Sequence, residues 1–518
     1  MKWYSAATAA LALLASHAHA TVSSEADKRK LNQRLKQAEV FYNAKKSTDA
    51  LVELDAAIAL TEFNTLPEET RAQVYAMAAA SAREAGRHKE AYAHTLSGTK
   101  LKGAHVFLWQ LRLGSELVSN RYADAVATVE AVASRSPDTL NEWPILWLNQ
   151  LNNQVGKLPD KGVQRRLLVI LTGPSYQPQE AAADLSGFRR DLASIKLEEG
   201  DIAGAKTLMA GVLSPRIMIR ASTDPRLSSI LPADFDVRAL AEQRLAQLRE
   251  IAVSHPGSMA AVLDIAQYLR MLGRAEESLA TINTASPMDV QAAGFTDLDR
   301  QLNWWWDGLA NSHLMLGHYD AAIAALRQGA KAKENSVPNV SQALNLAEVQ
   351  LRFGHPEDAL ATLAPFEQMA PASASKKIGH SPVPIGSAAG RNMSPYGEMV
   401  YRTIHGSALF ALGRAEEASG DVAYAAAHEK DNGRGLIFLQ IYAGDMDAAA
   451  AALIRRLDDP DSRSEAIIQM SECDDPPVAL PPDPFETGLN QLALRPDVKA
   501  AIARAGGVRR FHIQAAYV

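Results

Sequence analysis

A recurring pattern of polar and small apolar positions divides the chain into pairs of helices. A helical stretch ends at Gly, four mostly polar residues follow, and Ala stands five positions after the Gly. Gly and Asn accept the left-handed backbone that ends a helix, and acidic residues complement the dipole of the next helix. Strict examples begin at Gly86, Gly200, Gly317, Gly354, Gly413 and Gly444; Gly273 leads to Ser278, and Asn120 and Lys45 replace the Gly elsewhere.

A second regularity supports the pairing of these helices. If the two helices pack antiparallel, another small residue is expected twelve positions before each small residue that follows a turn. Seven of the nine positions hold Ala or Gly, which favours helical hairpins throughout. The nine positions are Ala38, Ala79, Leu113, Ala193, Ala266, Ala310, Ala347, Gly406 and Ile437.

The segment from residue 306 to 322 resembles a tetratricopeptide (TPR) repeat. The matching residues, at the spacing of that family, are Trp306, Leu309, Ala310, Gly317, Tyr319 and Ala322. Leu326 stands where an aromatic residue is usual, and Glu334 where Pro is usual. The resemblance implies an all-α fold: a right-handed superhelical solenoid of TPR-like helix-turn-helix repeats.

Irregular spacing of the turns indicates how the chain is organised. The gaps from Ala125 to Ala205 and from Ala205 to Ser278 are long enough for one additional degenerate helix pair each. Breaks rich in Pro, Gly and Ser mark a flexible surface insertion and a rigid spacer. The expected parts are a signal peptide (1–20), N-terminal repeats (21–136), an irregular helical region (137–250), C-terminal repeats (251–473) with an insertion at 371–395, and a Pro-rich spacer with a C-terminal cap (474–518).

The first twenty residues have the features of a secretory signal. Lys2 precedes an apolar run from Ala6 to Ala15, interrupted only by Thr8, and Ala18 and Ala20 suit a signal peptidase. We therefore expect cleavage after Ala20 and a periplasmic or secreted protein, with an uncleaved anchor as the alternative. The rest of the chain has no stretch of 18 uninterrupted apolar residues, so no transmembrane segment is expected after cleavage.

Composition excludes several classes of function. Ala is abundant and aromatic residues are only 6%, which disfavours β-barrels and sandwiches. A net charge of −6 provides no general attraction for nucleic acid. The single cysteine, Cys473, excludes an intrachain disulfide framework. Because Cys473 lies beside acidic residues, it should be a poor nucleophile. We expect it to be either a thiol without a functional role or a residue that forms an intermolecular disulfide.

The chain lacks the common catalytic and cofactor motifs. No phosphate-binding loop, dinucleotide fingerprint, zinc-protease motif or serine nucleophile elbow occurs. The paired carboxylates Asp445 and Asp447 lie in a repeat turn and are interpreted as helix-capping residues. We therefore expect no enzyme activity, no cofactor and no metal site. A cryptic catalytic site within 137–232 remains the alternative.

Three consecutive tryptophans, residues 304 to 306, form the most unusual local feature. Successive helical residues are about 100° apart, so the three cannot share one face. Trp304 aligns with Asp307 and Asn311, and the TPR resemblance implies that this stripe faces a concave groove. Asn345 and Glu348 occupy the equivalent stripe of the next repeat. The alternative is that all three tryptophans pack between adjacent repeats.

The candidate groove contains mixed acids and amides. A clamp for a C-terminal carboxylate, known in some TPR proteins, is not supported, because the matching positions include Asp264, Gln267, Asp307 and Glu348. Such a surface favours a neutral or basic ligand over an anionic one.

These observations predict an exported, non-catalytic protein-binding or scaffolding module of the cell envelope. The expected partner is a protein or peptide in the concave groove. The tail from Arg495 to Phe511 is similar to that of exported bacterial TPR proteins. An accessory role in the assembly or export of an envelope polysaccharide, with a glycan as partner, is the alternative.

Overall fold

A computed structural model describes residues 25–232, 235–286, 294–331, 333–334, 337–367, 393–479 and 483–514. These residues fall into two compact units, 25–179 and 180–514. The boundary lies inside the region 137–250 that the sequence analysis treats as one irregular segment. Each unit consists of helical hairpins.

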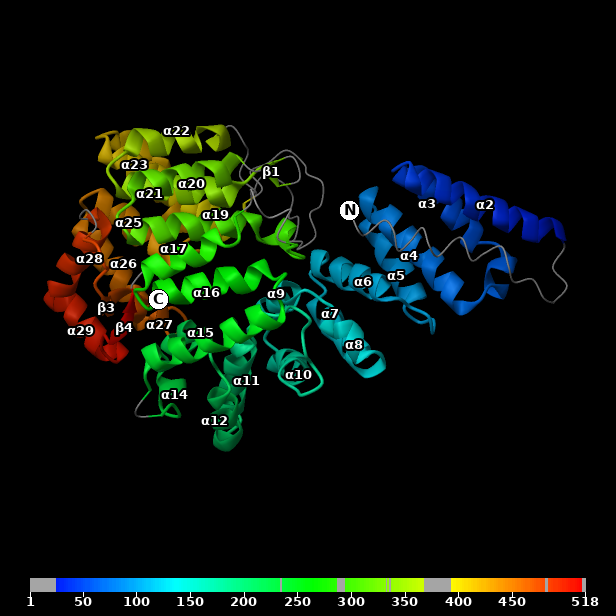
Figure 1. Cartoon of the computed structure of the whole chain (residues 1–518), viewed down its shortest axis with the longest axis horizontal. Helices are drawn as coiled ribbons and strands as arrows, with labels where there is room; N and C mark the ends of the chain where they lie inside the picture. The colour runs from blue at the N-terminus through cyan, green and yellow to red at the C-terminus, as the bar shows by residue number, and fades with distance from the viewer. Residues whose placement is uncertain are drawn as a thin grey trace. The chain divides into compact units, whose positions relative to one another are not determined.

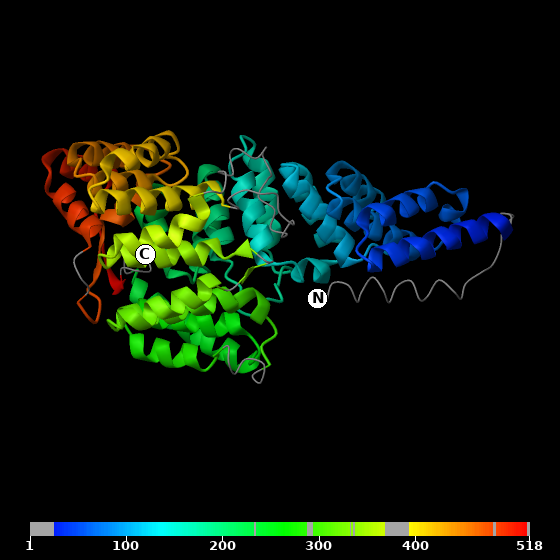
Figure 2. The same cartoon turned by 90° about the horizontal axis from the view of Figure 1, so that it is seen from above.

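The first unit contains four helical hairpins, α2/α3, α4/α5, α6/α7 and α9/α10, in which each helix contacts its partner (Figure 2). Helix α4 also contacts α6, the helix that starts the next hairpin. The elements are α2 (Glu25–Asn43), α3 (Ser47–Ile58), the short 3₁₀ helix η2 (Thr61–Thr65), α4 (Glu68–Glu84), α5 (His88–Gly98), α6 (Val106–Val118), α7 (Tyr122–Arg135), α8 (Pro137–Asn141), α9 (Ile145–Val155) and α10 (Lys161–Leu171).

The second unit contains the hairpins α11/α12, α16/α17, α19/α20, α21/α22, α23/α24 and α25/α26 (Figure 1). Its helices are α11 (Ser186–Glu198), α12 (Ile202–Ala210), α13 (Pro215–Thr223), α14 (Pro225–Ser228), α15 (Val237–Ser254), α16 (Met259–Met271), α17 (Ala275–Asn283), α19 (Leu298–Met315), α20 (Tyr319–Lys331), α21 (Val340–Arg352), α22 (Pro356–Glu367), α23 (Pro395–Ala411), α24 (Ala415–Ala427), α25 (Gly433–Tyr442), α26 (Met446–Asp458), α27 (Arg463–Met470), α28 (Pro484–Leu494) and α29 (Pro496–Ala505). Two short antiparallel strands, β1 (Lys333–Glu334) and β2 (Val337–Pro338), lie between α20 and α21.

The nine predicted turns are confirmed by their backbone geometry. All nine residues have positive φ, from 56° at Asn120 to 82° at Gly200. Lys45 and Asn120 are the non-glycine residues in this conformation within the described part of the chain. In each turn the next residue donates its backbone N–H to a carbonyl five positions earlier, as Arg87 does to Ala82 at 2.8 Å. This bond defines a Schellman ending, which satisfies a carbonyl at the helix terminus.

The predicted register of the hairpins is also confirmed. The nine small residues after the turns, from Ala50 to Ala449, are at most 1% exposed, and their nine partners twelve positions earlier are all buried. At Gly406 the space is fully used, because a Cβ there would lie 3.0 Å from Cβ of Asp421 in the paired helix α24. Small residues therefore set the distance at which the paired helices pack.

The two long gaps hold helices that the turn pattern did not identify. The first contains the hairpin α9/α10, and the second contains α13, α14 and α15. In α9/α10 the residues twelve apart are polar, and Gln164 Nε2 donates a 3.0 Å hydrogen bond to Asn152 Oδ1. Gly156, after α9, has a φ of −61°, which is not left-handed. This hairpin thus uses neither of the two recurring signals.

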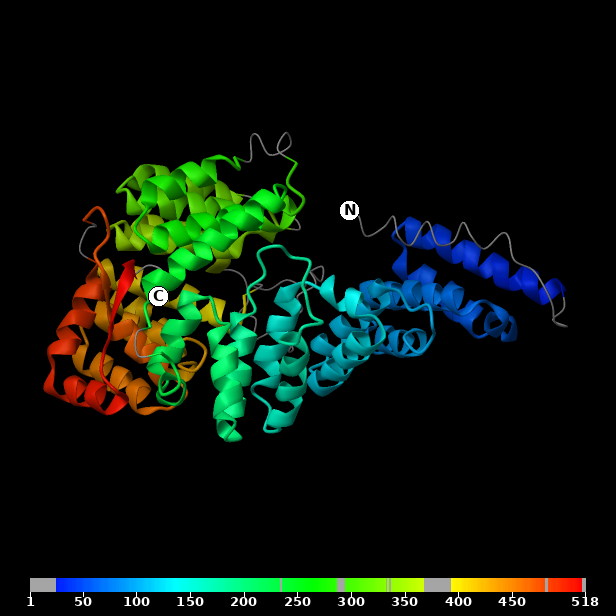
Figure 3. The ribbon, with the colours of Figure 1, turned by 60° about the horizontal axis from the view of Figure 1, so that its bottom comes forward.

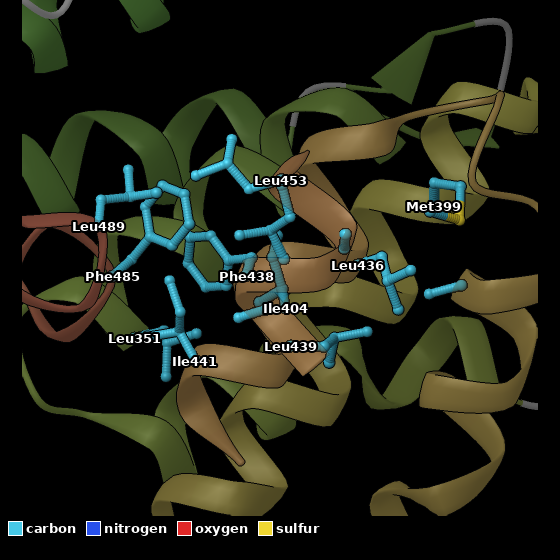
Figure 4. Close-up of a cluster of buried hydrophobic side chains, with 14 of the residues drawn as sticks. Leu351, Met399, Ile404, Leu436, Phe438, Leu439, Ile441, Leu453, Phe485 and Leu489 are labelled. Carbon is cyan, nitrogen blue, oxygen red and sulfur yellow. The ribbon is translucent and has the colours of Figure 1, made fainter. Parts of the chain in front are cut away.

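The core of the C-terminal hairpins is a continuous cluster of aliphatic and aromatic side chains (Figure 4). Phe438 of α25 stacks on Phe485 of α28, with ring centroids 4.4 Å apart. The region expected to form the C-terminal cap contains the helices α28 and α29, which contact α25 and α26. Gly488 permits this close packing, because a Cβ there would lie 2.4 Å from Ile441.

The C-terminal strand, in contrast, packs against helices from the first half of its unit. Strand β4 (Arg510–Gln514) pairs in parallel with β3 (Glu472–Asp474), and it contacts α15 and α16 (Figure 3). Phe511 and Ile513 are buried in the cluster formed by these helices. Nearby, Ser464 of α27 donates a hydrogen bond to the carbonyl of Arg220 in α13. The end of the chain therefore joins the last hairpins to the first helices of the same unit.

The signal peptide predicted at 1–20 and most of the predicted insertion (371–392) lie outside the described residues. Within the described part, helix α23 starts at Pro395, where the insertion was expected to end. None of the described helices combines the length and apolar character needed to cross a bilayer.

Candidate ligand-binding site

Helix α19 places the three tryptophans in three different environments. Trp305 is buried, and its Nε1 donates a 3.1 Å hydrogen bond to the carbonyl of Ile282. Trp306 is half-buried and packs against the clusters of two successive hairpins. Trp304 is 57% exposed. The alternative that all three pack between repeats is therefore wrong for Trp304.

Asp307, one turn after Trp304, is held by amides from two helices. Asn311 Nδ2 donates to Asp307 Oδ2 at 3.1 Å and to its carbonyl at 2.9 Å. Asn345 Nδ2 of α21 donates to Asp307 Oδ1 at 2.8 Å. Burial raises the pKa of Asp307, and the charge of Arg270 and the two amide bonds oppose that rise. These residues were predicted to lie on one stripe, and the structure shows that the two amides bind Asp307.

A cavity of about 280 Å³ opens between α16 and α19, beside Trp304. Trp304 and Asp307 line one side, and Asp264 and Gln267 of α16 line the other. At Gly308, helix α19 also lies close to α17, because a Cβ there would lie 2.9 Å from Cδ1 of Ile282. The remaining lining residues are Ala260, Leu263, Arg270, Gln301 and Gly308.

Asp264 is the most unusual group in this cavity. Its carboxyl is half-buried and has no hydrogen-bond or ion-pair partner among the described residues. Burial raises its pKa to about 6; Arg244 and Arg216 oppose the rise, and Asp184 adds to it. The repeat register predicts a groove position for Asp264 but no role. Only the tertiary structure shows that the carboxyl is unpaired.

Glu348, the last residue of the predicted stripe, lies outside the cavity. Its side chain is exposed to solvent on α21. The structure therefore brings Trp304, Asp307, Asn311 and Asn345 together and leaves Glu348 one turn further along α21.

At α25 the same stripe is covered by another helix of the chain, α28. Arg434, Phe438 and Tyr442 stand in α25 at the register positions of Asp307, Asn311 and Met315 in α19. Phe485 of α28 stacks on Phe438, and the guanidinium of Arg434 lies 5.0 Å from the Phe485 ring centroid.

An ion pair from α21 also binds helix α28. Arg352 Nη2 pairs with Glu486 at 2.9 Å, and its Nε lies 3.4 Å from Asp483. The open part of the stripe therefore lies on α16, α19 and α21. The sequence around α25 could not have predicted that α28 covers it, because α26 and α27 lie between the two helices in the chain.

A second cavity, of about 600 Å³, lies among α22, α23 and α24. His405 Nδ1 lies 2.7 Å from Asp421 Oδ2, and its Nε2 lies 3.5 Å from Glu367. Arg402 pairs with both Asp421 and Glu398. No motif spacing in the sequence links the residues of this cluster, so it could not be predicted. Its described lining residues include no Ser, Thr, Cys or Lys that could serve as a nucleophile.

Two other residues considered in the sequence, Asp445 and Cys473, do not form a ligand site in the structure. Asp445 caps α26 by accepting a 3.0 Å hydrogen bond from the N–H of Ala448, as predicted. Burial and the adjacent Asp474 raise the pKa of Cys473 to about 11, which disfavours the thiolate. Across the described residues, no three His, Cys, Asp or Glu side chains are placed to hold a metal ion.

No protein-family model matches the chain, and no curated protein sequence is significantly similar to it. Solved structures with weak similarity include yeast Tom70, which is 13% identical with a TM-score of 0.30 over 93% of this chain and 100% of that chain. The Cut9–Hcn1 hetero-tetramer of APC/C is 14% identical with a TM-score of 0.28 over 92% of this chain and 90% of that chain. The TPR domain of P58(IPK) is 11% identical with a TM-score of 0.19 over 92% of this chain and 99% of that chain. TM-scores of 0.30 or below are too low to define a fold.

The class of the protein rests on its own geometry. Nine left-handed turns, buried small residues twelve positions apart, and helices that contact both their hairpin partner and the next hairpin define TPR-like helix-turn-helix repeats. The chain is an all-α protein built from such repeats.

Proposed function

We propose that the chain is a non-catalytic protein-binding or scaffolding module, and that the open stripe on α16, α19 and α21 is its binding surface. The observation that carries the proposal is the exposed indole of Trp304 beside a polar cavity. Exposed tryptophans are frequent anchors at interfaces, because they contribute a large contact area at little cost in conformational entropy. Stacked helical repeats present extended surfaces of this kind.

Capture of partners from an extract of the native source tests this function. Wild-type protein should retain a defined set of proteins that Trp304→Ala loses. Tyr396→Ala is the matched control, since Tyr396 is another exposed aromatic residue of the same unit, 60% exposed. Circular dichroism verifies that both variants keep their helicity. Equal capture by all three proteins would place the binding surface elsewhere.

We also propose that the protein is exported, with the envelope as its place of action. The support is the pattern of Lys2, the apolar run and the Ala18 and Ala20 pair. N-terminal sequencing of the exported protein should start at Thr21. An exported protein that retains Met1 would contradict the proposed cleavage.

The alternatives have distinct outcomes in the same experiments. Captured saccharide without protein would favour a role in envelope polymer assembly or export. A cryptic enzyme in 137–232 has less support, because this region contains neither histidine nor cysteine and is divided between the two units.

A further inference from the structure

Two carboxylates face the cavity between α16 and α19, with a single cationic group among the described lining residues. Asp264 and Asp307 contribute the negative charges, and Arg270 contributes the positive one. Arg270 is 4% exposed, and its Nη1 donates to the carbonyl of Gly308 at 3.1 Å and to Ser312 Oγ at 3.2 Å. At formal charges the lining residues therefore carry −1.

The two carboxylates differ in the partners that the protein provides. Asp307 accepts hydrogen bonds from Asn311 and Asn345, which fix its orientation. Asp264 has no hydrogen-bond or ion-pair partner in the described part of the chain. A partly buried carboxylate without a partner is costly, and a ligand that donates hydrogen bonds to it recovers that cost.

The third element is the exposed ring of Trp304 at the same cavity. An indole face attracts cations, and guanidinium groups also stack on it because they are planar and weakly hydrated. An aromatic face beside an unpaired carboxylate is a suitable environment for such a group, which can stack and donate hydrogen bonds at the same time.

We propose that this cavity binds the side chain of an arginine in an extended segment of the partner protein. The guanidinium stacks on Trp304 and donates hydrogen bonds to Asp264, while Asp307 contributes its charge from the opposite side. This inference rests on the proposed function, since it names the chemistry that the binding surface recognises. It also explains why the two amides are bound to Asp307: they hold a carboxylate in place for a ligand.

The test uses the full chain labelled with 5-fluorotryptophan and observed by ¹⁹F NMR. The chain has seven tryptophans, and Trp304→Phe identifies the resonance of residue 304. The probe is acetyl-arginine methylamide, and the control ligand is the citrulline analogue, which has nearly the same shape but no charge. The arginine probe should shift the Trp304 resonance in a saturable manner, and the citrulline analogue should bind at least about tenfold more weakly.

Two variants locate the interaction. Asp264→Asn keeps the shape of the side chain and should weaken the response to arginine by about tenfold. Glu276→Gln removes an exposed acid from the neighbouring helix α17 and should leave the response unchanged, which controls for net charge. The proposal is overturned if arginine and citrulline act alike, if no saturable shift occurs, or if Asp264→Asn responds as the wild type does.

The outcomes also separate this inference from the proposed function. If Trp304→Ala loses its protein partners but the arginine probe does not bind, the binding surface stands and the arginine pocket is rejected. If the probe binds but partner capture is independent of Trp304, the pocket is real and the proposed role of the surface fails.

Discussion

Ser278 Oγ donates a 2.9 Å hydrogen bond to the main-chain carbonyl of Ala266, twelve residues earlier. These are the two positions at which the helices of the α16/α17 hairpin meet. Ser can replace the usual Ala at this fully buried position because its hydroxyl is hydrogen-bonded. The hydroxyl also lies 2.8 Å from Ser312 Oγ of α19, so one polar atom links two successive hairpins.

The size limit at the hairpin contact predicts the effect of Ala322→Leu. Ala322 is completely buried between α19 and α20, so the larger side chain should overpack the contact and lower the free energy of unfolding by about 1–3 kcal/mol. Ala324→Leu is the control, because Ala324 is exposed on the same helix. Chemical denaturation measures both variants. Equal stability of the two would contradict the register described above.

The left-handed turns predict a stabilising substitution in the first unit. Lys45 has a φ of 57°, which is unfavourable for a residue with a Cβ. Lys45→Gly should therefore raise the unfolding free energy of this unit by about 0.5–1 kcal/mol. Lys36→Gly, at an exposed position within α2, should lower it by about 1 kcal/mol. If both substitutions destabilise the protein, residue 45 does not carry this strain in solution.

The C-terminal strand should stabilise helices that are distant in sequence. Ile513 is fully buried against α15 and α16, and we expect Ile513→Ala to cost about 2–5 kcal/mol. Hydrogen exchange of amides in α15 and α16 should accelerate in this variant. Val508→Ala, at an exposed position just before the strand, should leave exchange unchanged. Unchanged protection of α15 in Ile513→Ala would show that β4 does not pack there in solution.

The unpaired Asp264 predicts a pH-dependent effect of Asp264→Asn. The pKa of this carboxyl is raised to about 6 in the folded protein, because burial and Asp184 outweigh Arg244 and Arg216. The folded state therefore binds the proton more tightly than the unfolded state, and ionisation costs stability as the pH rises from about 4 through 6.

Asp264→Asn removes this ionisation and should gain stability only at higher pH. Two pKa units correspond to about 3 kcal/mol at most, and because water screens the partly exposed carboxyl we expect about 1–2 kcal/mol at pH 7.5. Near pH 4 the variant and the wild type should be about equally stable. Denaturation at both pH values measures the difference, and a gain that does not depend on pH would exclude a raised pKa as its cause.

The sequence by itself determined the repeating unit. A left-handed residue ends a helix for reasons of backbone sterics, and two small residues twelve positions apart define where a hairpin closes. Both effects act within about twenty residues, so Lys45 and Asn120 could be identified as turn residues despite their side chains. The hairpin α9/α10 was not identified because it uses a polar pair, Asn152 and Gln164, in place of small residues.

Only the tertiary structure decided which parts of the stripe are open and which groups are free. Ser464 and Arg220 are 244 residues apart, and no local pattern predicts that they meet. The covering of α25 by α28, the exposure of Trp304 and the unpaired state of Asp264 depend in the same way on contacts between distant helices. Helical periodicity assigns a residue to a face, but solvent exposure and pairing depend on what packs against that face, and this is settled only when the whole unit folds.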